Sequence, residues 1–588
     1  MTATFGLENN SNAWSLGLIS PSSTLLATRL ADVVPLLDAA EAEALAGSYV
    51  AVMLSYEAAP AFDCAFKTHS FHSLPLAWAA VFPDSSEFPT KCAGNYSTAS
   101  WQPQITRSKY TSSVERIREM ISAGDTYQVN YSFPLISKFS GDAYAWYRDL
   151  CIAQGAQYCA YLDLGRYKLL SLSPELFFER RGYHVVTKPM KGTVRRGRWP
   201  AEDEELASWL RNSPKDQAEN VMIVDLLRND LGKVSTPGSV QASSLFQLER
   251  FETLWQLTST VESTLKDGVS FAELMAALFP CGSVTGAPKV RTMEIINNLE
   301  PFPRGAYTGA IGFLRPGGDC IFNVAIRTLV LDSLSGEVTF GVGGGVTFDS
   351  TAEREYEECM VKSSFLFNLP ITFQLLEAIL LEEGDYFLLD RHLTRFEASA
   401  NFLGFSFPEK IRLELDRIAA AHRTGSWKIR VLLTKNGQLE FEALRLEKIE
   451  RELRSVALAT EPIDSANRLF FHKTTSRSFY SSQLEARFDC DDVVFWNERG
   501  EVTESSIANV VLPVDGKLFT PPVSAGLLAG TFRDQLLAEG KILERAITIE
   551  ELREASEFFL INSVHKWMRA TLHPQISQIS QIQSKKTK

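Results

Sequence analysis

Residues 337–362 read EVTFGVGGGVTFDSTAEREYEECMVK. The first part, EVTFGVGGGVTF, is typical of a strand, and the glycines of GVGGGVTFDS (341–350) would let backbone amides approach an anionic group before a helix N-terminus. Glu355 and Glu358 are three residues apart and Lys362 follows four later, which places all three on one face of a helix. This stretch predicts a mixed α and β fold in which a glycine-rich turn lies beside an acidic helix.

A second helix carries a similar acidic pair. In KDQAEN (215–220), Asp216 and Glu219 are three residues apart. Two acidic faces that meet would form a hard oxygen site suited to Mg²⁺, although the spacing alone fits solvated helix faces as well. CGSVTGAPK (281–289) is another glycine-rich turn that opens a helix. Together with Arg327 on the strand AIRTLVL, these turns indicate a site for a small carboxylated molecule.

A single lysine follows the next pair of predicted strands. The run YKLLSLSPELFFERRGYHVVTKPM indicates two strands joined by a turn, so Lys191 of KPMKGT (188–193) is expected at or just past a strand end. A lysine there is either a solvated surface group or a nucleophile or base, because a buried lysine loses its proton easily.

The composition bounds the class of protein. The chain has 588 residues, 45% hydrophobic and 22% charged, which predicts a globular protein of two to four domains. The net charge of -12 and the lack of a long basic run argue against a nucleic-acid partner, and no stretch is apolar enough to predict a membrane partner. Eight cysteines without CxxC pairing favour a reduced, cytoplasmic compartment.

The patterns divide the chain into segments. We expect an N-terminal domain over 1–105, a catalytic α/β domain over 106–366 and a further domain over 370–575, where the strand and helix pattern restarts. The join between the last two is short and not rich in Gly or Ser, so domains that touch are expected. The polar, repetitive residues 576–588 predict a disordered tail.

A resemblance follows from the order of these motifs. SLSPELFF, KPMKGT, KDQAENVMIVDLLRNDLG, CGSVTGAPKVRTMEII, GAYTGAIGF, AIRT and GGGVTFDSTAEREYEECMVK occur as in the chorismate-utilising enzymes. The resemblance covers about residues 1–366 and implies a large α/β sandwich around Mg²⁺-bound chorismate. It implies Glu219 and Glu358 as direct Mg²⁺ ligands, with Asp216 and Glu355 reaching the metal through water. The residues that would bind chorismate are Arg327, Gly343, Gly344, Gly345, Thr285 and Lys362.

The resemblance also implies the chemistry. Glu175 resembles the general acid that protonates the departing ring hydroxyl. Anthranilate synthases carry alanine at the position of Lys191, whereas lysine resembles aminodeoxychorismate synthases, in which the amine expels the hydroxyl and ammonia then displaces the lysine. Gln256 stands where many relatives have histidine. No cysteine has the setting of a glutaminase nucleophile, so free ammonia or a separate glutaminase subunit is expected to supply the nitrogen.

The last domain carries a second ordered series. Lys473 lies in a polar loop, Glu504 lies near a strand end, and Gly530 and Thr531 open a helix. A lysine, an acid and a helix N-terminus are what pyridoxal phosphate requires, although Lys473 alone could be a surface residue. Over about 370–572 the series resembles the branched-chain aminotransferase and 4-amino-4-deoxychorismate lyase family, the fourth fold type of pyridoxal phosphate enzymes.

On that resemblance Lys473 would bind the cofactor covalently, Glu504 would pair with its pyridine nitrogen, and Arg395 would contact its phosphate with the amides of Gly530 and Thr531. Glu377 lies where some lyases carry threonine, which leaves the reaction open between lyase and aminotransferase. The family often builds this site near a dimer interface, so a homodimer through this domain is possible.

The two resemblances meet at one metabolite. They imply a bifunctional enzyme that aminates chorismate to 4-amino-4-deoxychorismate and then eliminates pyruvate to give 4-aminobenzoate, the aromatic part of folate. Two alternatives concern the last domain: an amino-acid aminotransferase, or a docking module without catalysis. A third, anthranilate synthesis in the first half, is disfavoured by Lys191.

Overall fold

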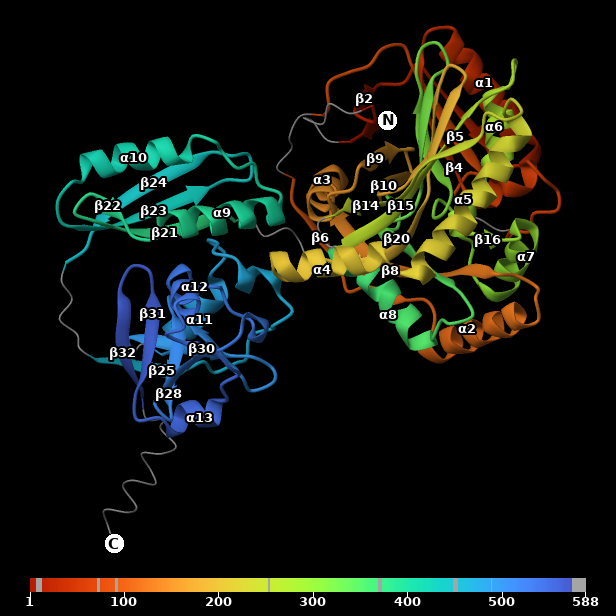
Figure 1. Ribbon diagram of the computed structural model, residues 1–588. Helices are drawn as coiled ribbons and strands as arrows, with labels where there is room; N and C mark the ends of the chain where they lie inside the picture. Colours follow the sequence, from red (N-terminus) through yellow and green to blue (C-terminus); the bar gives the residue numbers. More distant parts are fainter. Residues whose placement is uncertain are drawn as a thin grey trace. The chain divides into compact units, whose positions relative to one another are not determined.

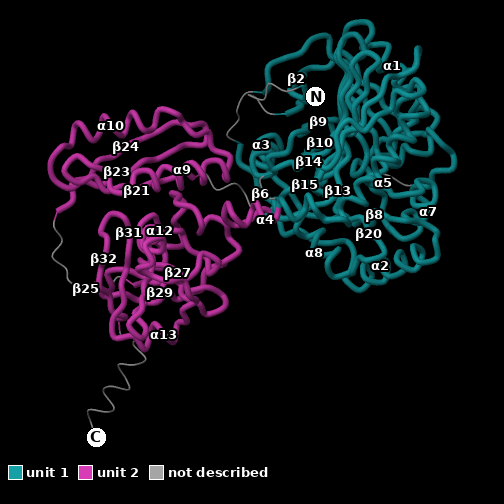
Figure 2. Tube along the Cα trace, in the orientation of Figure 1, with its two compact units in different colours: residues 1–195, 207–370 teal, residues 196–206, 371–588 magenta. Residues whose placement is uncertain are grey.

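The computed structural model describes residues 1–6, 13–70, 74–89, 94–251, 254–367, 373–447, 453–487 and 489–573. They form two compact units (Figure 2): unit 1 comprises 1–195 and 207–370, and unit 2 comprises 196–206 and 371–588. The boundary expected at residue 105 falls inside unit 1, where strands from both sides of it pair in the same sheets. The tail expected over 576–588 lies outside the described residues.

Unit 1 contains two large, mainly antiparallel sheets (Figure 1). Among the described residues, the first has the strand order β16 (Gly286–Ala287), β8 (Gln128–Gly141), β20 (Glu337–Val346), β19 (Thr328–Asp332), β10 (Tyr167–Ser173), β9 (Tyr158–Asp163), β1 (Thr2–Phe5) and β2 (Leu16–Ile19), with β6 (Tyr96–Thr98) and β7 (Gln102–Pro103) beside β8. The second has the order β13 (Met190–Arg195), β15 (Leu254–Thr264), β12 (His184–Lys188), β11 (Leu176–Arg181), β18 (Cys320–Val324), β17 (Ala310–Leu314), β4 (Tyr49–Leu54), β5 (Ala77–Phe82) and β3 (Ser23–Ala27), with β14 (Gln241–Arg250) beside β15.

The two sheets pack face to face, with helices on both outer faces. On β4, Ala51 and Met53 enter a core shared with strands of the first sheet, whereas Val50, Val52 and Leu54 point to the opposite face, as the two-residue period of a strand requires. The helices over the outer face of the second sheet are α1 (Val33–Leu45), α5 (Pro214–Val234) and α6 (Phe271–Leu278). Those over the first sheet are α2 (Arg107–Ser122), α3 (Ala143–Gln154), α7 (Lys289–Leu299) and α8 (Ala352–Ser363). The predicted α/β sandwich is confirmed.

Three local predictions need correction. Lys191 lies just past the end of β12, as expected, but it belongs to a further strand, β13, because the chain resumes pairing with β15 after Pro189. The glycines expected in a turn lie inside β20, which pairs with β8 along its whole length. Arg327 is not part of a continuous strand: it lies between β18 and β19 with φ +50°, a conformation that turns the chain there.

Unit 2 contains two smaller sheets. The first has the order β22 (Asp385–Tyr386), β21 (Leu375–Glu382), β23 (Ser426–Leu433) and β24 (Leu439–Arg445), and it packs with α9 (Leu389–Leu403) and α10 (Ile411–Ala421). The second has the order β27 (Val502–Ser505), β26 (Asp492–Trp496), β25 (Leu453–Leu458), β32 (Lys566–Leu572), β31 (Phe558–Asn562), β28 (Asn509–Val514), β29 (Lys517–Thr520) and β30 (Leu543–Glu544). Its helices are α11 (Ser478–Glu485), α12 (Thr531–Ala538) and α13 (Ile549–Glu554).

The expected restart of the pattern near residue 370 agrees with these bounds, since β21 and α9 coincide with the strand and helix read from the sequence. Among the described residues, no helix combines the length and the apolar character that crossing a membrane would need.

Candidate active sites

Unit 1 encloses a cavity of about 470 Å³ where distant parts of its sequence meet. Strand β13 contributes Lys191, the turn before β11 contributes Glu175, and the turn before β19 contributes Arg327. The other predicted residues that line it are Asp216 and Glu219 from α5, Glu355, Glu358 and Lys362 from α8, and Gly343 and Gly345 from β20. Most of the predicted site therefore forms one cavity.

Helix capping places the first pair of acids. Ser213 is the N-cap of α5, and its hydroxyl accepts a hydrogen bond from the Asp216 amide and donates one to the Asp216 carboxylate. Pro214 occupies the first turn, where its missing N–H costs nothing. Asp216 and Glu219 consequently both reach the cavity from the first turns of α5.

The second pair comes from α8, whose first turn holds Glu355. The Ser350 hydroxyl donates to Glu355 at 2.7 Å, and Lys362 pairs with Glu358 at 2.7 Å. Burial, opposed by Ser350 and reinforced by the neighbouring Glu358, raises the pKa of Glu355. Burial also raises the pKa of Glu219, even though Lys191 favours its charged form. A cluster of carboxylates whose charge is this costly to bury is suited to a cation.

These residues fit a magnesium ion. Carboxylates from two helices face one cavity, and hard oxygen ligands of this kind leave coordination positions for water and for an acidic substrate. Asp216, Glu219, Glu355 and Glu358 would hold the ion.

The glycines of β20 let side chains in the cavity lie close to the strand backbone. A Cβ on Gly345 would lie 2.9 Å from Lys191 Nζ, and a Cβ on Gly344 would lie 2.9 Å from Glu355 Oε2. Both side chains thus approach the bare backbone of the strand, as only glycine allows. Lys362 Nζ donates to the Gly343 carbonyl at 3.0 Å, which fixes this lysine against the same strand.

Lys191 and Glu175 have shifted proton affinities of opposite sign. Burial lowers the pKa of Lys191, partly offset by the nearby Glu219 carboxylate. Burial raises the pKa of Glu175 to about 7, against the effect of the Ser283 hydroxyl, which donates to Oε1 at 2.7 Å. Relative to an ordinary lysine and glutamate, both shifts favour the uncharged forms, and a neutral amine and a carboxylic acid are the forms of a nucleophile and a general acid.

Arg327 is buried, and burial lowers its pKa to about 10. Its Nη1 has no hydrogen-bond partner among the described residues. A buried, unpaired guanidinium nitrogen on a cavity wall is costly unless an anion binds it. Arg327 is thus well placed for a carboxylate of a ligand.

Two predicted substrate residues do not line the cavity. Thr285 is fully buried and its hydroxyl donates to the Cys281 carbonyl at 3.1 Å, so the side chain supports its own turn. Gly344 faces Glu355 and contributes room rather than a lining atom. Conversely, Ser283 and Gln256 line the cavity, and the sequence analysis assigned a role to neither residue. Ser283 belongs to the glycine-rich turn CGSVTGAPK, which was the available signal.

Unit 2 has its own cavity, of about 130 Å³, lined by all five residues predicted there: Lys473, Glu504, Arg395, Gly530 and Thr531. Burial, together with the nearby Arg395, lowers the pKa of Lys473 to about 8. Gly530 is the N-cap of α12 and Thr531 its first residue, as predicted. The free backbone amides at this helix end make an anion site.

Glu504 is held by two groups that the sequence analysis missed. The Tyr480 hydroxyl donates to Oε1 at 2.8 Å, and the Leu528 amide donates to Oε2 at 3.3 Å. Burial raises the pKa of Glu504 to about 7, opposed by Tyr480 and Arg477. No short-range pattern marks Tyr480, because it is brought to β27 by the packing of α11.

Arg395 is anchored by Glu377. Its Nε and Nη2 donate to the two oxygens of Glu377 at 2.9 and 2.8 Å, and Nη1 donates to the Ala529 carbonyl at 2.9 Å. His392 bridges Glu377, at 2.7 Å, and the Thr531 hydroxyl, at 3.2 Å. Although burial opposes ionisation, Arg395 and His392 hold the pKa of Glu377 far below its usual value. Glu377 therefore serves as a buried anchor for the anion site and does not line the cavity.

These residues fit pyridoxal phosphate. Lys473 would hold the aldehyde carbon, Glu504 the pyridine nitrogen, and Thr531 with the amides of α12 the phosphate, and the electron-withdrawing ring would supply an electron sink. Each nitrogen of the Arg395 guanidinium already donates one hydrogen bond, and Nη1 and Nη2 each keep a second N–H that a phosphate could accept.

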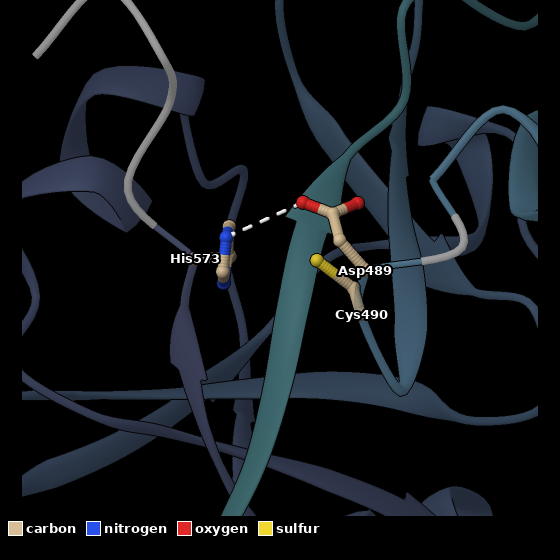
Figure 3. Close-up of side chains that lie close together, drawn as sticks. All are labelled: Asp489, Cys490 and His573. Carbon is tan, nitrogen blue, oxygen red and sulfur yellow. Dashed lines mark ion pairs between the residues drawn. The ribbon is translucent and has the colours of Figure 1, made fainter. Parts of the chain in front are cut away.

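A third cluster in unit 2 has a different nature. Asp489, Cys490 and His573 lie close together (Figure 3), with their potential ligand atoms within 4.8 Å of one another. His573 pairs with Asp489 at 3.3 Å, but the Arg487 Nε also donates to Asp489 at 3.3 Å, and its Nη2 lies 3.9 Å from Cys490 Sγ. Because a guanidinium already neutralises this carboxylate, we interpret the cluster as an ion-pair group at the surface.

The first cavity has the acids and the buried arginine that a carboxylated ligand and a cation require, and the second has the lysine, the acid and the helix N-terminus that pyridoxal phosphate requires. Comparison with known proteins agrees: residues 86–368 match the chorismate binding enzyme family, and residues 374–572 match the class IV amino-transferase family. The chain thus contains a chorismate-binding domain followed by a class IV amino-transferase domain.

Relatives of the first domain include aminodeoxychorismate synthase component 1 of Salmonella typhimurium, 42% identical over 45% of this chain and 58% of that protein. An anthranilate synthase component 1 of Haloarcula marismortui is 39% identical over 52% of this chain and 62% of that protein. The chain thus spans less than two thirds of the length of these relatives. The crystal structure of anthranilate synthase component I from Streptococcus pneumoniae shares the fold, with a TM-score of 0.53, 24% identity and coverage of 61% of this chain and 93% of that one.

Proposed function

We propose that the chain makes 4-aminobenzoate from chorismate in two consecutive reactions, one in each unit. The observation that carries this proposal is Lys191: a half-buried lysine with a lowered pKa that shares its cavity with Glu175, whose pKa is raised to about 7, and with four carboxylates. The similarity of the first domain to aminodeoxychorismate synthase component 1 supports the same reaction.

In the first reaction, the Lys191 amine attacks the ring of chorismate. A bond forms between Nζ and the ring, and the bond to the ring hydroxyl breaks as Glu175 donates a proton, so that water leaves. Ammonia then forms a bond at the carbon that lost the hydroxyl, and the Lys191–ring bond breaks, returning its electron pair to Nζ. The proton that ammonia loses returns to the Glu175 carboxylate.

The substrate is oriented by charge. Arg327 binds one carboxylate of chorismate through its unpaired Nη1. A magnesium ion held by the acids of α5 and α8 would bind the other carboxylate and neutralise it. The ammonia comes from solution or from a separate glutaminase subunit, as in an enzyme built from two components.

In the second reaction, 4-amino-4-deoxychorismate is cleaved in unit 2. Pyridoxal phosphate, when bound, would supply the electron sink for this cleavage. Lys473 Nζ, as a free base, takes the proton from the carbon that bears the amine and delivers it to the methylene carbon of the departing three-carbon group. That group leaves as pyruvate, and the ring becomes aromatic. The pKa of about 8 suits Lys473 to both proton transfers near neutral pH.

The test is to incubate the purified chain with chorismate, Mg²⁺, an ammonium salt at alkaline pH and pyridoxal phosphate, and to identify the products by chromatography. 4-Aminobenzoate with an equal amount of pyruvate is expected. Accumulated 4-amino-4-deoxychorismate would support only the first reaction. Conversion of an added 2-oxo acid to an amino acid, with no pyruvate released from 4-amino-4-deoxychorismate, would favour the aminotransferase. An ortho-aminobenzoate product would overturn the proposal for unit 1.

A further inference from the structure

Residues 196–206, called the linking segment here, belong to unit 2, although the chain on both sides of them belongs to unit 1 (Figure 2). In sequence the segment separates β13, which carries Lys191, from α5, which carries Asp216 and Glu219. Among the residues that the structure describes, none of 196–206 lines either cavity. Its place in unit 2 is therefore not explained by substrate or cofactor binding.

One anchor of the linking segment is Arg196. The side chain is 4% exposed, and its Nε and Nη2 each donate to the Asp203 carboxylate at 2.8 Å. Its guanidinium carbon lies 4.7 Å from the centre of the Phe402 ring, and Nη2 donates to the Phe402 carbonyl at 3.4 Å. The Phe402 ring stacks on His472, with centroids 4.7 Å apart. A buried, paired arginine thus supports the residue next to Lys473 through one aromatic ring.

The second anchor is the pair Arg198 and Trp199. The Trp199 ring packs on the Phe471 ring, with centroids 5.1 Å apart. Arg198 lies 4.7 Å from the centre of the Trp199 ring, and its Nη1 donates to the Ser465 carbonyl at 3.3 Å. Stacked aromatic pairs and cation–π contacts fix ring orientation as well as burying area. Phe471 is thereby held two residues before Lys473.

The other side of the Lys473 backbone is fixed by β21. The Leu376 amide donates to the Lys473 carbonyl at 2.9 Å, and Leu375 forms a bridge with Thr474. On the near side, the linking segment packs directly on Phe471 and reaches His472 through Phe402, and the Ser399 hydroxyl of α9 lies 2.9 Å from His472 Nδ1.

The charged groups that most affect the Lys473 amine come from elsewhere. They are Glu377 of β21, Arg395 of α9, Arg477 before α11 and Glu504 of β27. Since the linking segment supplies none of these four, its effect on Lys473 would be geometric: it sets how far the amine lies from these charges.

We propose that the linking segment positions Lys473, so that residues encoded within the first domain complete the active site of the second. Trp199 and Arg196 are positioning residues, acting through Phe471 and through Phe402 and His472. This inference rests on the proposed role of Lys473 as the residue that binds the cofactor.

The experiment uses full-length variants loaded with pyridoxal phosphate: Trp199→Leu, Trp199→Phe, Arg196→Ala and, as the matched control, Glu205→Ala at an exposed position of the same segment. Two quantities are measured: the pH midpoint of the visible absorbance of bound cofactor, and the dissociation constant of the cofactor. Trp199→Leu keeps apolar packing but removes ring stacking, and Trp199→Phe keeps a ring.

Trp199→Leu and Arg196→Ala are expected to move the pH midpoint by about half a unit or more and to weaken cofactor binding by about three- to tenfold. Trp199→Phe should restore most of both values, and Glu205→Ala should match the wild type. An unchanged midpoint and affinity in both Trp199→Leu and Arg196→Ala would overturn the inference. If the wild-type chain has no visible absorbance band of bound cofactor that is lost when Lys473 is replaced, the proposed function of unit 2 is refuted instead.

Discussion

Each of the two cavities holds a half-buried lysine proposed to react, Lys191 or Lys473, but the charged groups around the two amines differ. Lys191 faces mainly carboxylates, of which Glu219 affects it most, with Lys362 as the opposing cation. Lys473 lies near two guanidinium groups, of Arg395 and Arg477, and two carboxylates, of Glu377 and Glu504, and Arg395 affects it most. Burial lowers the pKa of both amines, so the neighbours decide how far each one falls.

This difference indicates the role of the acidic residues in each unit. In unit 2, Glu377 is the acid that most affects the pKa of Lys473. Its carboxylate is paired with Arg395 and His392, which fixes it in the fold. In unit 1 the acids point into the cavity and repel one another, as Glu358 does Glu355. Unit 1 therefore keeps its negative charge available for a cation, and unit 2 keeps positive charge available for an anion.

The sharpest way to break the comparison is Lys191→Ala. Because no other group would then form the bond to the ring, we expect formation of 4-amino-4-deoxychorismate to fall by a factor of about 10³ or more, measured by chromatography at saturating chorismate. The control is Lys188→Ala, three residues before Lys191. It removes a lysine that is paired with Glu249, and its rate should stay near the wild-type rate. An unchanged rate in Lys191→Ala would show that ammonia attacks directly.

Glu175→Gln tests the acid of unit 1. The amide cannot donate an acidic proton to the leaving hydroxyl, so we expect the rate of chorismate consumption to fall by about 10²- to 10⁴-fold. Since burial raises the pKa of Glu175 to about 7, its acid form is lost as pH rises through 7, so the contribution of Glu175 to the wild-type rate should decline above pH 7. This decline should be absent in Glu175→Gln, and a variant that keeps it would assign the acid role elsewhere.

Glu377→Gln tests whether the main acid of unit 2 is structural. The change leaves Arg395 and His392 buried beside a neutral amide, and breaking a buried pair in this way costs about 3–5 kcal/mol of folding free energy. Thermal unfolding should therefore show a destabilised unit 2. The control is Glu382→Gln on the same strand, where the exposed pair with Lys566 should contribute under about 1 kcal/mol. Equal losses in the two variants would contradict the anchor role.

The sequence was sufficient to predict features that depend on residues close together in the chain. The spacing of Asp216 and Glu219 predicted a helix face, and Gly530 and Thr531 predicted a helix start; both are present because periodicity and capping act over a few residues. The meeting of the acids of α5 and α8 could be expected only from resemblance, since their spacing alone also fits solvated faces.

Other features depend on long-range packing and left no local trace. Strand β13 exists because β15 offers it a partner, and the φ of +50° at Arg327 occurs where the chain passes from β18 of one sheet to β19 of the other. Tyr480 reaches Glu504 through the placement of α11. The linking segment reads as an ordinary loop and helix of the first domain, and only its contacts with Phe402 and Phe471 assign it to unit 2.

The smallest effect concerns the pH dependence of Lys473, and it sharpens the comparison of the two amines. Only the neutral amine captures pyridoxal phosphate, and a lowered pKa makes that form available at lower pH. With a pKa of about 8, the capture rate of the cofactor-free chain should rise about threefold between pH 7.5 and 8.5 and level off above about 9. An ordinary lysine, measured as the free amino acid derivative in the same buffers, should rise about tenfold over that interval and continue to rise. A tenfold rise in the protein would mean that the guanidinium groups and burial leave Lys473 unperturbed, and the contrast between the two cavities would then rest on Lys191 alone.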